Sequence, residues 1–177
     1  MANKNTQGFG LIPGDRLGNT PAISGQSKYF IDAGVAGAIY NGSAVKSAAG
    51  YIVNGQGSAA KVVGVLNGVF FNAATTLKPT FANFYSGSIT PANSEDITAF
   101  VNDDPFQNYI VGTDDAVAQA GYLETYDMNT TAGSDTTGKS SATLDIGVTG
   151  NDNKQYRLLR SAEDPSNDTN AAFRSVI

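Results

Sequence analysis

From residue 28 onward the chain is built from short apolar runs that are separated by Gly, Asn, Asp or Pro. The runs are rich in Val, Ile, Phe and Tyr, which favour strands, and no long helical pattern lies between them to connect parallel strands. This pattern predicts an all-β fold, a single antiparallel barrel or sandwich domain. The strands are expected at residues 28–32, 38–40, 51–54, 60–71, 96–102, 106–113, 122–126, 142–148, 155–160 and 171–177.

Two of these runs differ in how their apolar residues are spaced. The run KVVGVLNGVFF, residues 61–71, is apolar at most successive positions, which is typical of a central strand covered on both faces. Gly64 and Gly68 within it predict a bend or a bulge. The run ITAFVN, residues 97–102, alternates Ile, Ala and Val with Thr, Phe and Asn, which predicts a half-buried strand.

The turn residues support this strand pattern. Asn-Gly pairs at residues 41–42, 54–55 and 67–68 predict tight hairpin turns, although the third pair can equally mark a bulge. Only residues 114–121 have a helix-like composition, and they predict one helical turn at most.

The first 27 residues have a different composition from the rest of the chain. Residues 1–27 are rich in Gly, Pro, Asn and Ser, which predicts an extended N-terminal arm ahead of a β-rich domain at residues 28–177. The arm could pack on its own domain or dock on a neighbouring subunit, and we expect the neighbour because a disordered tail would hold fewer apolar residues. The candidate binding residues of the arm are Phe9, Leu11, Ile12, Pro13, Arg16 and Leu17.

The chain contains no Cys, His or Trp. These absences exclude Cys-His nucleophile pairs, the Ser-His-Asp triad and the usual zinc sites. The adjacent carboxylates Asp103-Asp104 and Asp114-Asp115 would point to opposite faces of a strand, so neither pair provides the two converging carboxylates of a glycosidase. We therefore expect no enzymatic activity.

Two further motifs favour structural turns over ligand sites. Residues 55–60 spell G-x-G-x-x-A, but a β-branched run follows where a dinucleotide site would need a helix. The Asn- and Asp-rich segments 151–153 and 164–168 could offer oxygen ligands to calcium, but neither matches a calcium-binding loop. We expect no cofactor and no metal.

The charges are few and unevenly distributed. Eleven Lys and Arg against 16 Asp and Glu give a formal net charge of −5, which disfavours a nucleic-acid partner, and no apolar stretch is long enough to predict a membrane segment. Residues 1–78 carry six basic and two acidic side chains, whereas residues 79–138 carry nine acidic and no basic ones. The acidic stretch could simply be a solvated face, or the N-terminal part could meet an acidic partner.

Several motifs in order along the chain carry a resemblance to a known group. They are GFGLIPGDRLG, IYNGSAV, VVGVLNGVFF with KPTFANFYSGS, ITAFVNDDPFQNYIV, TAGSDTTGKSSATLD and QYRLLRSAEDPSNDTNAAFRSVI. In this order they resemble capsid decoration (cement) proteins of tailed bacteriophages, particularly of marine and cyanobacterial phages. The resemblance covers most of the chain, and its motifs are packing and turn signals.

The resemblance implies a structural virion protein, made in the host cytoplasm and located on the capsid exterior. Such a protein would bind the outer face of the major capsid protein shell and stabilise it, and it would form a homotrimer. Phe173 and Val176 in the apolar C-terminal run are the candidate subunit contacts. The alternatives are a phage tail or head-fibre base protein and a carbohydrate-binding β-module, although the aromatic cluster Phe81, Phe84 and Tyr85 fits the edge of a core better than a sugar platform.

Overall fold

The computed structural model describes residues 3, 5–18, 25–57, 61–147, 154–168, 170–172 and 174–177. Every ladder between the strands of this part of the chain is antiparallel, and no α-helix and no closed barrel occurs within it. The predicted all-β antiparallel fold is therefore confirmed. The strands are β1 (Ile12–Arg16), β2 (Ser27–Ile31), β3 (Ala44–Ala48), β4 (Tyr51–Asn54), β5 (Val62–Asn72), β6 (Pro79–Ala82), β7 (Ile97–Asn102), β8 (Gln107–Gly112), β9 (Thr125–Met128), β10 (Leu144–Asp145), β11 (Tyr156–Arg157) and β12 (Ser175–Val176).

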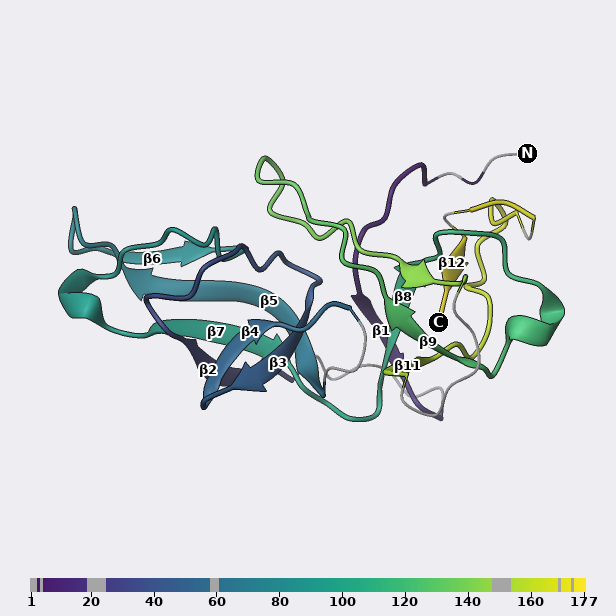
Figure 1. Ribbon diagram of the computed structural model, residues 1–177, viewed down its shortest axis with the longest axis horizontal. Helices are drawn as coiled ribbons and strands as arrows, with labels where there is room; N and C mark the ends of the chain where they lie inside the picture. The colour runs from purple at the N-terminus through teal and green to yellow at the C-terminus, as the bar shows by residue number, and fades with distance from the viewer. Residues whose placement is uncertain are drawn as a thin grey trace.

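The strands form two lobes that lie side by side along the long axis of the molecule (Figure 1). The sheet lobe contains one sheet in the order β2-β7-β5-β3-β4, with β6 added along the C-terminal half of β5. Strands β2 and β4 contact each other although they end the order at opposite sides, so the sheet is rolled. Its inner face holds a core of Ile31, Ile39, Val45, Ile52, Leu66, Val69, Tyr85, Ile97, Ala99 and Val101.

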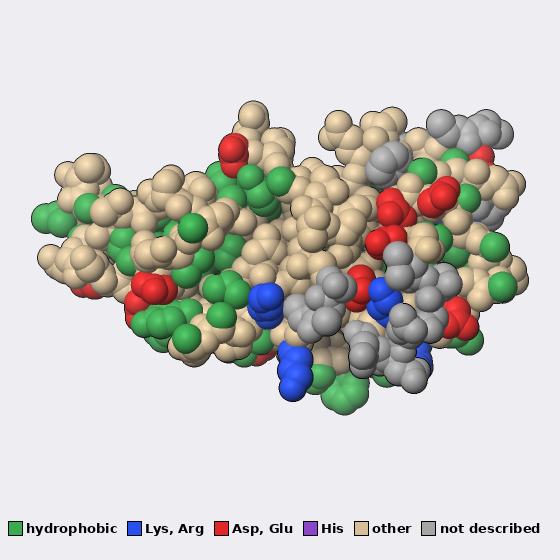
Figure 2. Space-filling view, in the orientation of Figure 1, with side chains coloured by type: hydrophobic (Ala, Val, Ile, Leu, Met, Phe, Trp, Pro, Cys, Tyr) green, Lys and Arg blue, Asp and Glu red, His purple; other side chains and the backbone are tan. Residues whose placement is uncertain are grey.

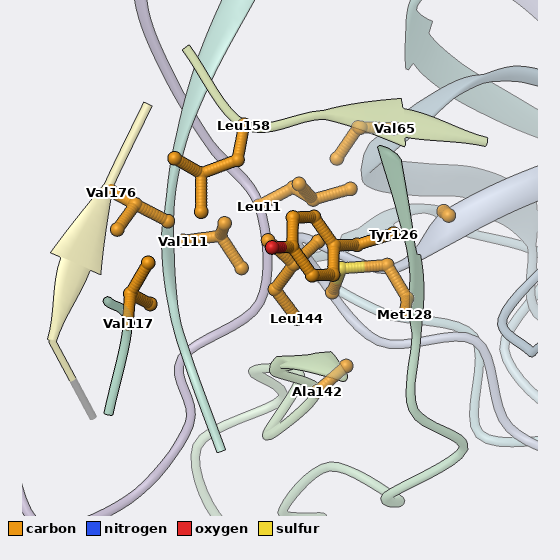
Figure 3. Close-up of a cluster of buried hydrophobic side chains, with 11 residues drawn as sticks. Leu11, Val65, Val111, Val117, Tyr126, Met128, Ala142, Leu144, Leu158 and Val176 are labelled. Atoms are coloured by element: carbon orange, nitrogen blue, oxygen red, sulfur yellow. The ribbon is translucent and has the colours of Figure 1, made fainter. Parts of the chain in front are cut away.

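The second lobe contains two small sheets, in the orders β1-β8-β12 and β10-β9-β11. Strand β1 comes from the start of the chain and lies beside β8 in this lobe (Figure 1). Apolar side chains from both sheets converge on one core, in which Tyr126 lies among Leu11, Leu144 and Met128 (Figure 3). The two lobes thus have separate cores.

A long loop between β9 and β10 ties the lobes together. The Tyr40 hydroxyl donates a hydrogen bond to the Asp135 carboxylate at 2.8 Å, and the Asn83 amide donates to the Thr137 carbonyl oxygen at 2.9 Å. Backbone hydrogen bonds between Asn41 and residues 138 and 140 of the loop add to this contact. The loop therefore holds the second lobe against the sheet lobe.

The predicted strands at 28–32, 51–54, 60–71, 96–102 and 106–113 are found as β2, β4, β5, β7 and β8. The strands predicted after residue 120 are present but shorter, and the run 38–40 forms a single bridge, from Ile39 to Tyr85. The helical turn predicted at 114–121 is a 3₁₀ turn, Gln119–Gly121. Strands β1, β3 and β6 were not predicted.

The hairpin turn predicted at Asn54-Gly55 is wrong, and the pair Asn67-Gly68, which could mark a hairpin or a bulge, forms a bulge. The turn between β3 and β4 is Ala49-Gly50, where both residues have positive φ (50° and 87°), as the tightest hairpin turns require. Asn54 is instead the last residue of β4, which does not pair with the next strand, β5. Asn67-Gly68 forms a bulge, because the register of β5 against β7 shifts between Leu66 and Gly68.

The structure corrects the N-terminal arm that was predicted at residues 1–27, as far as these residues are described. Residues 12–16 are strand β1, paired with β8, and β2 already begins at Ser27. The composition suggested an arm because Pro13 and Gly14 are usual in turns, but Pro is tolerated on an edge strand, where β1 lies. Residues 1, 2, 4 and 19–24 lie outside the described part of the chain.

Candidate functional site

The arm residues proposed to bind a partner divide into two groups. Leu11 is 2% exposed in the core of the second lobe, and the ring of Phe9 packs near Gly112 of β8. Arg16 already has an acceptor in its own chain, because its Nε lies 2.8 Å from the Asp104 carboxylate. These three residues therefore serve the fold. Ile12, Pro13 and Leu17 are exposed and stay candidates for a partner contact.

The proposed subunit contact at the C-terminus is corrected for one of its two residues. Val176 is 1% exposed, and its side chain belongs to the core of the second lobe (Figure 3). A side chain that fills its own core cannot also bury itself against a second copy. Phe173 lies outside the described residues.

Three exposed Phe side chains of the described part of the chain lie on the outer face of the rolled sheet. Phe30 of β2 is paired with Thr98 of β7, which is paired with Phe70 of β5, which is paired with Phe81 of β6. Because residues directly opposite in a ladder point to the same face, the three rings form a row across four strands. Their exposed fractions are 51%, 38% and 62%.

Phe100 extends this row toward the neighbouring position of β7. It lies opposite Gly68 of β5, and its ring centroid is 6.1 Å from that of Phe81 with the planes tilted by 42°. A Cβ atom at Gly68 would approach the Phe81 ring to 2.6 Å, so the glycine provides the space in which that ring lies. We call Phe30, Phe70, Phe81 and Phe100 the outer aromatic face.

The same side of the sheet is covered at its other end. Val65 and Ala44 point to the outer side, and both are buried in the core of the second lobe. Beyond the Gly68 bulge the second lobe no longer covers the sheet, and the aromatic residues are exposed. Figure 2 shows hydrophobic side chains gathered over the sheet lobe, whereas Asp and Glu are more frequent over the second lobe. The outer aromatic face is therefore the uncovered half of a sheet face whose other half is packed.

Sequence reasoning missed three of the four residues of this face. The signal was present in the alternation: Phe100 shares its face of β7 with the polar Thr98, and Phe30 shares its face of β2 with Lys28. The cluster expected at the edge of a core is split by the structure. Tyr85 is fully buried, Phe84 stacks on Tyr40 at 5.4 Å, and Phe81 lies on the outer face.

A pocket of about 740 Å³ lies beside the junction of the two lobes. Its wall includes Val62, Asn102, Tyr109, Lys154 and Tyr156. Burial raises the pKa of Tyr109 and of Tyr156 above the usual tyrosine value, so both phenols stay protonated and can only act as neutral hydrogen-bonding groups near pH 7. The two tyrosines of the pocket can therefore form hydrogen bonds to a bound molecule, but neither is an activated nucleophile.

A buried ion pair lies next to this pocket. Lys154 Nζ is 2.6 Å from Asp127 Oδ2, and the two side chains are 10% and 6% exposed. The pair joins β9 to the segment that leads into β11. Among the described residues, no group of three or more Asp, Glu, His or Cys side chains is arranged to hold a metal ion. The ion pair is best explained as a structural contact.

Comparison with known proteins does not add a family. No protein-family model, no curated protein and no solved structure matches the chain. Within the described residues there is also no helix of the length and apolar character that a membrane span requires. The outer aromatic face is consequently the feature from which a function can be argued.

Proposed function

We propose that this chain is a structural virion protein, a capsid decoration protein that binds the outer face of a shell of major capsid protein and stabilises it. The observation that carries the proposal is the outer aromatic face. A contiguous apolar patch on a water-soluble surface is a common mark of a protein-protein contact. The motif resemblance of the chain to phage decoration proteins supplies the identity of the partner.

The geometry favours a protein partner over a sugar. A carbohydrate platform needs rings that lie flat side by side with polar groups around them to bind hydroxyls, whereas Phe81 and Phe100 are tilted by 42°. All four rings are Phe, which has no hydrogen-bonding group, and the polar side chain within the row is Thr98. Apolar aromatic residues of this kind are enriched where proteins meet proteins.

The proposal includes a non-catalytic role and a homotrimer. A decoration protein stabilises the shell by the contacts it makes and not by catalysis, and a site made of apolar rings is consistent with this role. The homotrimer rests on the resemblance alone, since the proposed contact residue Val176 is used within its own chain. Sedimentation of the purified chain at micromolar concentration decides between a trimer and a monomer.

The direct test is binding of the purified full-length chain to empty shells assembled from the major capsid protein of the same virus. We expect the chain to pellet with the shells in a saturable manner and to raise the temperature at which they open. Pelleting that never saturates, or no pelleting, would contradict the proposal. Binding to a glycan in place of the shell would favour the carbohydrate-binding alternative.

A further inference from the structure

We infer that the pocket beside the junction of the two lobes binds an uncharged small molecule with an apolar body and one hydrogen-bond acceptor. The apolar body lies against the core of the second lobe, and the acceptor lies toward Tyr156. This ligand site goes beyond the proposed function, and it does not depend on what covers the outer aromatic face.

The first argument is the place and size of the pocket. Its volume of about 740 Å³ lies within the range of small-molecule sites, roughly 300–1,000 Å³. Protein interiors are close-packed and contain few voids larger than a water molecule. The wall of this pocket nevertheless includes side chains of the hydrophobic core, several of which are shown in Figure 3: Leu11, Val111, Leu144, Leu158 and Val176. A cavity of this size against a core is suited to hold an apolar group.

The second argument is the rim of the pocket. Leu17 and Phe106 both line the pocket, although they are 59% and 55% exposed. The Leu17 backbone N–H donates a hydrogen bond to the Phe106 carbonyl oxygen at 2.8 Å, which keeps the two residues next to each other. A single exposed apolar residue is ordinary on a protein surface, whereas two together at the opening of an apolar cavity extend its wall. We call these two residues the pocket rim.

The polar groups of the wall are mostly bonded within the chain. The carbonyl oxygen and the side-chain oxygen of Asn102 accept from the Tyr109 hydroxyl, at 3.1 and 3.3 Å. The Gln107 amide donates to the carbonyl oxygens of residues 14, 15 and 108. A ligand therefore finds few free polar groups on these residues, and most of its contact is apolar.

The charges of the described wall balance one another. They are two carboxylates and two cations, on Asp103, Asp104, Lys154 and Arg157. Asp104 and Lys154 are already in ion pairs, which leaves one charge of each sign. A charged ligand would meet a like charge as well as an opposite one, and it would also lose its hydration in an apolar cavity. The pocket therefore favours an uncharged molecule.

The third argument is an unpaired hydroxyl. Tyr156 lines the pocket, and its hydroxyl is buried without a hydrogen-bond partner among the described residues. Most buried polar side-chain atoms in folded proteins have a partner. The phenol stays protonated near pH 7, because burial raises its pKa, so it can donate. A carbonyl oxygen of a ligand at this end of the pocket supplies the acceptor.

The test uses Prodan, an uncharged naphthalene that carries a ketone and whose fluorescence reports its surroundings. Titration of the full-length chain should show saturable binding at one site, with emission moved to the blue. Anilinonaphthalene sulfonate, an anionic probe of similar size, should bind more weakly. No saturable binding of Prodan would overturn the inference. Tighter binding of the sulfonate that is lost in Arg157→Ala would assign the pocket to anions and also overturn it.

A pair of double variants locates the probe. Leu17→Asp combined with Phe106→Ser changes the pocket rim and should weaken Prodan binding at least about tenfold. The matched control is Leu123→Asp combined with Phe81→Ser, because these residues are 67% and 62% exposed and neither lines the pocket. The control should bind like the original chain, and thermal melting checks that both variants are folded. The reverse result would place the probe on the outer aromatic face and contradict the inference.

Tyr156→Phe tests the hydrogen bond to the ligand. A hydrogen bond to its ketone moves the emission of Prodan to the red, so the variant should bind Prodan more weakly and with bluer emission than the original chain. Unchanged affinity and emission would show that the Tyr156 hydroxyl does not contact the ligand, and would overturn the assignment of the acceptor. None of these outcomes depends on binding to shells, so the proposed function is tested separately.

Discussion

Val65 and Leu66 are adjacent in strand β5, yet their side chains belong to different hydrophobic cores. Val65 is buried in the core of the second lobe, and Leu66 is buried in the core of the sheet lobe. Neighbouring residues of a strand point to opposite faces, so one strand can serve both cores. The two lobes therefore share a wall, and their stabilities are coupled through it.

The first prediction concerns this shared wall. Leu66→Ala should lower the free energy of unfolding by about 2–5 kcal/mol, since it leaves a cavity in a packed core. Because β5 belongs to both cores, denaturant unfolding should remain a single transition. Leu123→Ala is the control: Leu123 is 67% exposed, and a surface change of this kind shifts stability by about 0.5 kcal/mol or less. Two separate transitions would contradict the shared wall.

The second prediction concerns Gly64, also in β5. A Cβ atom at this position would lie 2.2 Å from the Asn102 carbonyl oxygen of β7, so the strands would have to separate. Gly64→Ala should therefore lower the melting temperature markedly. Gly25→Ala is the matched control, because a Cβ there meets no atom within 4 Å. Equal melting temperatures for the two variants would show that β5 and β7 do not approach this closely.

The neighbouring strands β3 and β4 show how much of the fold the sequence could predict, because β4 was predicted and β3 was not. Residues 51–54 have the β-branched and aromatic composition of a strand, and β4 was predicted with its bounds. Its partner β3, AVKSA, contains only one β-branched residue, so its composition does not predict a strand. Strand β3 joins the sheet because Val45 is buried in the core of the sheet lobe. The turn that joins them uses Ala49, a residue with no turn preference, so tertiary packing overrides the local signal there.

The candidate site could be predicted only in part. The alternation in residues 97–102 placed Phe100 on the polar side of a half-buried strand, which was the signal of a ring on the outer side of the sheet. The row of Phe30, Phe70 and Phe81, however, depends on the sheet order and on the register of four strands. Register is set by core packing between residues far apart in the chain, and one sequence does not contain it in readable form.

The third prediction concerns the buried ion pair. Lys154→Met should destabilise the fold by about 3–5 kcal/mol, because it leaves the Asp127 carboxylate buried without its cation. Combining Lys154→Met with Asp127→Leu removes both charges and should recover most of that loss. Chemical denaturation of the three proteins measures the difference. A single variant as stable as the original chain would mean that Asp127 is solvated.

The fourth prediction concerns alkaline pH. Burial raises the pKa of Tyr156 in the folded chain above that of the unfolded chain, which is about 10. Below pH 10 the phenol is protonated in both states and its titration does not affect stability. Above that pH the unfolded state loses its proton first, so the free energy of unfolding should fall as the pH rises. Urea denaturation between pH 8 and pH 11 measures this slope.

Tyr156→Phe is the control for the alkaline effect. The Tyr156 hydroxyl is buried and has no hydrogen-bond partner among the described residues, so its removal should not lower stability at pH 7. The variant should show a smaller loss of stability above pH 10 than the original chain. An unchanged slope would assign the alkaline effect to other tyrosines, such as Tyr109, whose pKa burial also raises.

The central claim is that the sheet lobe attaches this protein to a capsid shell. An electron cryo-microscopy reconstruction of shells saturated with the full-length chain tests it most directly. The account predicts density for the two lobes in which the outer aromatic face on β2, β5, β6 and β7 is covered by the shell. Density in which the outer aromatic face is open to solvent, or shells without added density, would contradict it.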